Sequence, residues 1–137
     1  MKALTANGTI RTARFVKLDA SDNNSILEAD ANERVVGISQ IGSRTAPIPD
    51  VTADPPEAAQ SGEHCNVHLE GEDCLLMIGT GGCTAGGLLK SDADGKGVAI
   101  SEAAAAKQEV GAIALETASA GQYARVTVRV GTVTTPA

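Results

Sequence analysis

Apolar and polar side chains alternate most clearly over residues 122–130. The valines occupy one set of alternate positions and the polar residues the other: Val126, Val128 and Val130 against Arg125, Thr127 and Arg129. A period of two is typical of a strand with one buried face. It therefore predicts a strand whose valines lie in the core and whose two arginines lie on a surface.

Shorter apolar stretches recur along the chain, separated by turns rich in Gly, Asn and Asp. They predict strands over residues 9–18, 26–29, 35–41, 65–69, 74–78, 88–90, 98–100 and 110–117. The run 74–78 is continuously apolar and is interpreted as a buried strand, and the turn 70–73 before it places Cys65 and Cys74 on neighbouring strands. Short strands at even spacing predict a mainly β fold: a small β-sandwich or barrel-like domain with extended arms and at most one short helix.

The remaining segments define the domain organisation. Residues 101–108 (SEAAAAKQ) form the one helix candidate. Residues 42–63 hold four of the five prolines and predict a long loop, with one helical turn possible over 54–59. The chain therefore divides into an N-terminal arm (1–10), a single β-rich domain (11–130) with the Pro-rich loop inserted, and a C-terminal tail (131–137).

Composition points to a thin core. The chain has one Phe, one Tyr, no Trp and 15 Gly in 137 residues, so core volume must come from Val, Ile, Leu and Ala. Such a chain gains stability by burying surface against a partner. The run 74–78 is too short to span a membrane, no signal peptide is visible, and we expect neither a membrane nor nucleic acid as partner, since the net charge is −6.

Basic residues concentrate at the two ends of this acidic chain. Residues 1–18 hold Lys2, Arg11, Arg14 and Lys17 without an acid, and residues 123–137 hold Arg125 and Arg129 without an acid. Both ends are predicted to meet an acidic partner surface, although scattered charges also serve solubility alone.

Candidate chemistry is weak. The glycine cluster 79–87 has the spacing of a phosphate loop, but Leu88 stands where the lysine is needed. Metal-ligand and nucleophile types gather at His64, Cys65, His68 and Cys74, which leaves a small β-barrel hydrolase or metal-binding protein as an alternative. Burial of the cysteines as small apolar residues is the preferred interpretation, so we expect no enzyme, no metal and no cofactor.

The order of several segments resembles that of the small capsid decoration (cement) proteins of tailed phages. These segments are RFVKL at 14–18, ADANERVVGIS at 29–39, VHLEG at 67–71, AGGLLKSDADGKG at 85–97, EVGAIALE at 109–116 and ASAGQYARV at 118–126. The resemblance implies a β-rich domain, usually a trimer, made in the host cytoplasm and bound to the outer surface of the capsid at threefold or quasi-threefold positions. Its partners would be the major capsid protein and further copies of itself, and its role would be to stabilise the shell. Another virion component, such as a head-fibre base, is an alternative.

The arm and the Pro-rich loop are predicted to carry the contacts to the capsid and between subunits, because neither shows an internal pattern and the arm is basic. Deleting residues 1–8 would then abolish capsid binding and leave the fold intact. The predicted contact residues are Met1, Lys2, Leu4, Asn7, Ile10, Arg11, Pro47, Ile48, Pro49, Pro55 and Pro56.

Overall fold

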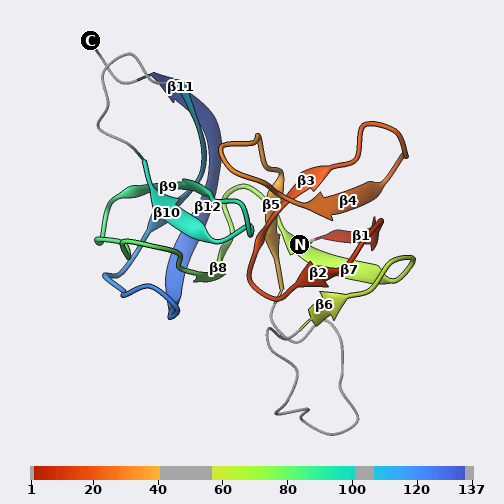
Figure 1. Ribbon diagram of the computed structural model, residues 1–137, viewed down its shortest axis with the longest axis horizontal. Coiled ribbons are helices and arrows are strands. Elements are labelled where there is room, and N and C mark those ends of the chain that lie inside the picture. Colours follow the sequence, from red (N-terminus) through yellow and green to blue (C-terminus); the bar gives the residue numbers. More distant parts are fainter. Residues whose placement is uncertain (1, 41–56, 101–106, 135–137) are drawn as a thin grey trace, which may run out of the picture.

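The computed structural model describes residues 2–40, 57–100 and 107–134 (Figure 1). This part of the chain contains twelve strands and no helix, which confirms the mainly β fold. None of its elements is a helix of the length and apolarity needed to cross a membrane. The strands are β1 (Lys2–Ala6), β2 (Ile10–Arg11), β3 (Phe15–Leu18), β4 (Ser25–Glu28), β5 (Gly37–Ser39), β6 (Glu57–Ala59), β7 (His64–His68), β8 (Asp73–Met77), β9 (Leu88–Ser91), β10 (Gly97–Ala99), β11 (Lys107–Ala114) and β12 (Tyr123–Thr134).

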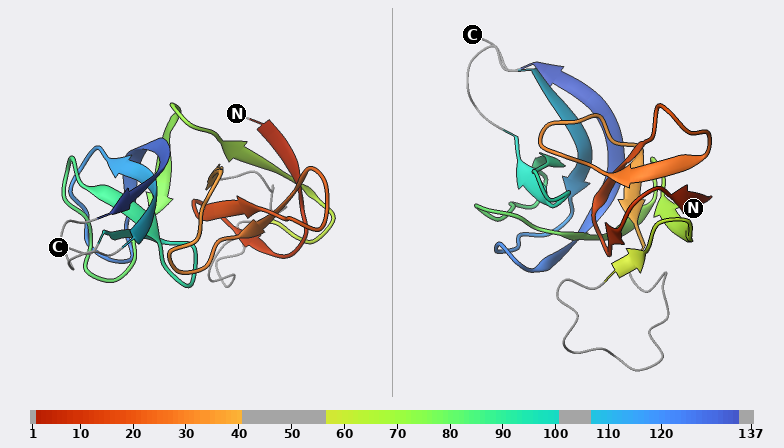
Figure 2. Two further views of the ribbon diagram at one scale, coloured as in Figure 1. Left: turned by 90° about the horizontal axis from the view of Figure 1, so that it is seen from above. Right: turned by 45° about the vertical axis from the view of Figure 1, so that its right-hand side comes forward.

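The strands form two lobes, which Figure 2 shows side by side. In the first lobe a closed barrel has the order β1-β4-β3-β5-β7, and a small β2-β6 sheet accompanies it. In the second lobe a five-stranded sheet has the order β10-β9-β11-β12-β8. A parallel bridge between Ile78 and Gly97 brings the two edges of this sheet together, so that it curls around its own core.

Residues 2–6 are a barrel strand, which corrects the prediction of a free N-terminal arm. β1 pairs in parallel with β4 and antiparallel with β7. Its alternate residues Leu4 and Ala6 are buried in the barrel. The sequence MKALTA is small and weakly patterned, but two alternating apolar residues are enough for a five-residue strand when both neighbouring strands supply hydrogen-bond partners.

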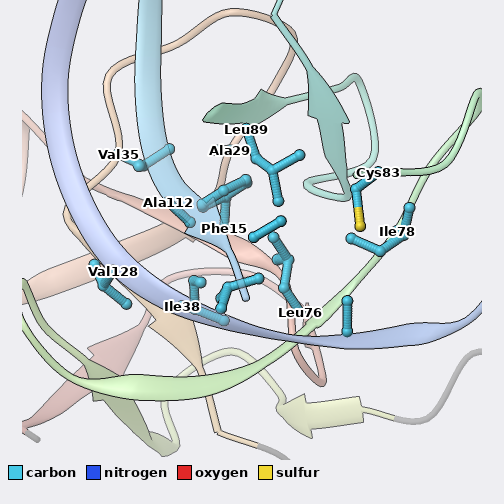
Figure 3. Packing of buried hydrophobic residues seen from close by; sticks show 13 residues of the cluster. Phe15, Ala29, Val35, Ile38, Leu76, Ile78, Cys83, Leu89, Ala112 and Val128 are labelled. Atoms are coloured by element: carbon cyan, nitrogen blue, oxygen red, sulfur yellow. The ribbon is translucent and has the colours of Figure 1, made fainter. Parts of the chain in front are cut away.

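Two apolar clusters share strand β3. Val16 points into the barrel, where it packs with Ile10, Ile26 and Val67. The adjacent Phe15 points out of the barrel into the second cluster, between the lobes, where Leu76, Leu89 and the valines of β12 surround it (Figure 3). Because successive residues of a strand face opposite sides, one short strand fills both cores and joins the lobes. The buried Val126 and Val128 and the exposed Arg125 and Arg129 confirm the predicted faces of β12.

The predicted strand 9–18 is divided into β2 and β3 by a bend at Ala13. Ala13 has a φ of 54°, in the left-handed region that non-glycine residues seldom adopt. Two hydrogen bonds with the second lobe hold the bend: the Met77 amide donates to the Ala13 carbonyl (2.9 Å), and the Phe15 amide donates to the Gly95 carbonyl (2.8 Å). A straight strand over 9–18 could not make these two contacts.

Other expectations need correction. Residues 57–59, predicted as part of a helical turn or loop, are strand β6, paired with β2. Residues 107–108 of the predicted helix belong to β11, and residues 101–106 lie outside the described residues. The turn at 70–73 does not close a hairpin: β7 pairs with β1 and β5, whereas β8 pairs with β12, so Cys65 and Cys74 lie in different sheets.

Two glycines permit close approaches that hold the strands in place. A Cβ at Gly37 would lie 2.1 Å from the carbonyl oxygen of His68 on the paired strand β7. A Cβ at Gly111, where β11 bulges, would lie 2.5 Å from the Phe15 ring. Each glycine is therefore required by space rather than by chain flexibility.

Candidate functional site

The residues predicted to make contacts are placed very differently by the structure. Leu4 and Ile10 are buried in the barrel core, so neither presents a side chain to a partner. Lys2 and Asn7 are exposed, and Arg11 is half-buried. The others, Met1, Pro47, Ile48, Pro49, Pro55 and Pro56, lie outside the described residues.

The cations of the N-terminal segment are used within the fold. The Arg11 guanidinium forms an ion pair with the Glu28 carboxylate, and the Arg11 amide donates to the same carboxylate (2.9 Å). Hydrogen bonding to Glu28 raises the pKa of Arg11 above its usual value. The Lys17 ammonium donates to both carboxylate oxygens of Glu33, at 2.8 Å each. These two cations are already neutralised and have little charge to offer an acidic partner.

Arg14 is buried between the lobes. Its amide donates to the Ser39 hydroxyl (3.0 Å), and its Nη1 donates to the Asp94 carbonyl in the turn between β9 and β10 (3.1 Å). Arg11 Nη2 donates to the same carbonyl at 3.1 Å. Burial lowers the pKa of Arg14, and its Nε has no hydrogen-bond partner within the described structure. Residues 11–15, here called the lobe junction, therefore tie the barrel to the second lobe.

The outer face of the second lobe has the opposite character. Leu115, Arg125 and Leu75 form one row across β12, since the Leu115 amide donates to the Arg125 carbonyl (2.9 Å) and Arg125 pairs with Leu75. Tyr123 and Met77 form the next row toward the lobe junction. Ile113, Thr127 and Asp73 form the row on the other side. We call this set of residues, together with Arg129, the outer face.

The arginines of the outer face differ from those of the lobe junction. Within the described residues, neither the Arg125 nor the Arg129 side chain has an ion pair or a hydrogen bond, and the Asp73 carboxylate accepts from the Thr127 hydroxyl (2.7 Å). Three of the four large exposed apolar side chains of the described residues lie here: Leu75 (38% exposed), Leu115 (42%) and Tyr123 (37%). The centres of protein interfaces are enriched in Tyr, Met and Arg, and the outer face combines these residue types with aliphatic side chains.

Only part of this surface could be predicted from the sequence. The alternation over residues 122–130 predicts the two exposed arginines correctly. The run 74–78 suggested a buried strand, yet Leu75 and Met77 face outward while Leu76 and Ile78 are buried. A continuous apolar run is produced equally by a strand buried on both faces and by a strand whose outer face is an apolar surface.

The candidate metal or nucleophile residues do not come together. His64, Cys65 and His68 lie on β7 of the barrel, whereas Cys74 lies on β8 in the other lobe. Burial raises the pKa of Cys65 to about 11 and that of Cys74 to about 12, so both thiols stay protonated at neutral pH. Among the described residues, no group of three or more His, Cys, Asp or Glu side chains could hold a metal ion.

Comparisons with known proteins found a similar fold but no matching family model or curated sequence. No protein-family model matches the chain. No curated protein matches it by sequence. Its fold is similar to the crystal structure of the head fibre gp8.5 N base of bacteriophage phi29, with a TM-score of 0.59. The match covers 93% of this chain and 92% of that chain at 18% sequence identity, so what the two proteins share is the fold.

Proposed function

We propose that this chain is a structural protein of a tailed-phage virion, bound to the outer surface of the head as a decoration protein. The observation that carries the proposal is the fold match to a phage head-fibre base over nearly the whole of both chains. The segment order that resembles capsid decoration proteins supports the same class of protein independently, since it comes from sequence patterns spread over residues 14–126.

In finer detail, the chain acts as a homotrimer at threefold or quasi-threefold positions, where it binds the major capsid protein and reinforces the shell. A role that depends on assembly suits a chain with two small cores and a single fully buried aromatic residue, Phe15. Repeated weak contacts around a symmetric particle add up through multivalency. The proposal assigns the chain no catalytic step.

A second candidate is the base of a head fibre, and it is favoured because the structure with the similar fold is itself a head-fibre base. Both candidates place the chain on the phage head but differ in what the chain carries. A decoration protein only covers the shell, whereas a fibre base also holds a fibre that projects from it.

The experiment that tests the proposal is binding of the purified chain to phage heads that lack it, imaged by electron microscopy. We expect added density on the outer surface. Density at every threefold or quasi-threefold position with nothing projecting beyond it supports decoration, and density at the foot of a projecting fibre in the complete virion supports the fibre base. Heads that look identical with and without the chain would contradict both.

A further inference from the structure

The outer face has a counterpart elsewhere on the same chain. Leu18, the fourth large exposed apolar side chain, is 59% exposed at the end of β3. It lines a surface hollow together with Arg34, Val35 and Val36. The half-buried Asp19 and the exposed Asp22 follow it in the turn to β4. We call Leu18, Val36, Asp19 and Asp22 the Leu18 patch.

The two surfaces are complementary in charge. The outer face presents apolar side chains around the guanidinium groups of Arg125 and Arg129, neither of which has a partner among the described residues. The Leu18 patch presents apolar side chains beside two carboxylates, and Arg34, which lines the same hollow, is already in an ion pair with Glu109 (3.5 Å). Asp19 accepts hydrogen bonds from Asn7 (2.5 Å) and Ser21, and Asp22 accepts one from Ser25; among the described residues neither carboxylate is in an ion pair. Carboxylate and guanidinium pair strongly when an interface removes water from both.

The two surfaces are also far apart on the molecule. In Figure 1 the turn between β3 and β4 lies at one end of the long axis, and the turn that follows β11 and Leu115 lies at the other. One copy therefore cannot cover its own outer face with its own Leu18 patch, but a second copy can. A contact between two different surfaces of identical chains is heterologous, and it closes into a ring or continues as a filament.

We propose that the outer face of one copy binds the Leu18 patch of the next. This contact would cover all four large exposed apolar side chains of the described residues and neutralise both free arginines. It deepens the proposed function, because it names the surfaces that join the copies of the suggested trimer, which is the closed ring of such contacts.

Two variants break one surface each. Arg125→Glu reverses the charge at the centre of the outer face and leaves the Leu18 patch intact. Leu18→Lys places a cation in the Leu18 patch and leaves the outer face intact. Asp30→Lys, which reverses an exposed charge in the turn after β4, is the matched control. All three positions are on the surface, and thermal unfolding of each variant verifies that the fold is kept.

The test is sedimentation velocity over a concentration series. We expect the wild type and Asp30→Lys to associate and each single variant to remain monomeric. An equimolar mixture of Arg125→Glu and Leu18→Lys should form a one-to-one dimer and nothing larger, since one intact copy of each surface remains. A monomeric wild type, a mixture without dimer, or association that Leu18→Lys leaves unchanged would overturn the proposal.

Head binding separates this inference from the proposed function. A chain that binds phage heads but stays monomeric in the sedimentation test refutes only the contact proposed here. A chain that forms the expected dimer in the mixture but adds nothing to heads refutes only the role on the virion.

Discussion

Two basic segments of this chain look alike in sequence and have opposite roles in the structure. Arg11, Arg14 and Lys17 are held inside the fold by Glu28, the Asp94 carbonyl and Glu33. Arg125 and Arg129 project from β12 without a side-chain partner in the described structure. The comparison teaches that a cluster of cations marks a partner surface only when the folded chain leaves those cations unpaired. Changes in the first segment should therefore alter stability, and changes in the second should alter association.

The largest expected effect follows from deleting residues 1–8. Because β1 pairs with both β4 and β7 and buries Leu4, its loss opens the barrel. We expect the truncated chain to lose its cooperative thermal unfolding transition, measured by circular dichroism. The point variant Lys2→Ala, which keeps the strand, should unfold as the wild type does. A truncated chain with a native transition would restore the view of this segment as a free arm.

The two aromatic residues provide a matched pair. Phe15 is fully buried at the lobe junction, so Phe15→Ala should lower the free energy of unfolding by about 3–5 kcal/mol. Tyr123 lies on the outer face, and its hydroxyl oxygen is 3.4 Å from that of Thr12. Tyr123→Ala should cost about 1 kcal/mol or less. Chemical denaturation measures both, and equal losses would remove the distinction between the two regions.

The ion pair at the junction gives a smaller effect. Glu28→Gln keeps the shape of the side chain but removes the charge that pairs with the half-buried Arg11. We expect a loss of about 1–3 kcal/mol, between that of a surface pair and that of a fully buried one. Arg125→Gln should change stability by less than about 0.5 kcal/mol, as is usual for an exposed residue. Denaturant titration of both variants tests this; a larger loss for Arg125→Gln would mean that the outer arginine has an internal role.

The smallest effect is a dependence on pH. Hydrogen bonds from Lys17 and from the Asp30 amide lower the pKa of Glu33 below its usual value of 4.5. Since the folded-state pKa is the lower one, the stabilisation is complete above pH 4.5 and is lost as the pH falls through the folded-state value. In Glu33→Gln this part of the acid sensitivity should be absent. Melting temperatures of both chains across the acid range should therefore converge at low pH, and a constant difference would contradict the assignment.

Local pattern predicted the strands well but not the pairing of the strands. The alternation around Val126 and Val128 needs no knowledge of neighbours, since burial of one face produces it directly. The pairing of β7, in contrast, could not be predicted from local pattern. The chain leaves the barrel after Leu69, and the Gly71 amide donates to the Val128 carbonyl of the other lobe. A short polar turn has the same sequence pattern whether it closes a hairpin or connects strands of two different sheets.

The candidate surface could be predicted only in part for a similar reason. The local sequence around an arginine does not show whether a carboxylate pairs with it in the fold. Arg11 is paired because Glu28, which is 17 residues away in the sequence, lies beside it in the structure. Leu75 and Leu115 lie in different predicted strands, and the order β11-β12-β8 that makes them neighbours of Arg125 is a property of the sheet. The composition of the outer face was visible in the sequence, but its continuity was not.

Hydroxyl-radical footprinting tests the account most directly, because it reads the outer face in the assembled particle. Purified virions and the dilute free chain are exposed to the same radical dose, and oxidation of Tyr123, Met77 and Leu75 is quantified by mass spectrometry. The account predicts that the chain is recovered from virions and that these side chains are protected there relative to the free chain. Absence of the chain from purified virions, or equal oxidation of the outer face in both samples, would contradict it.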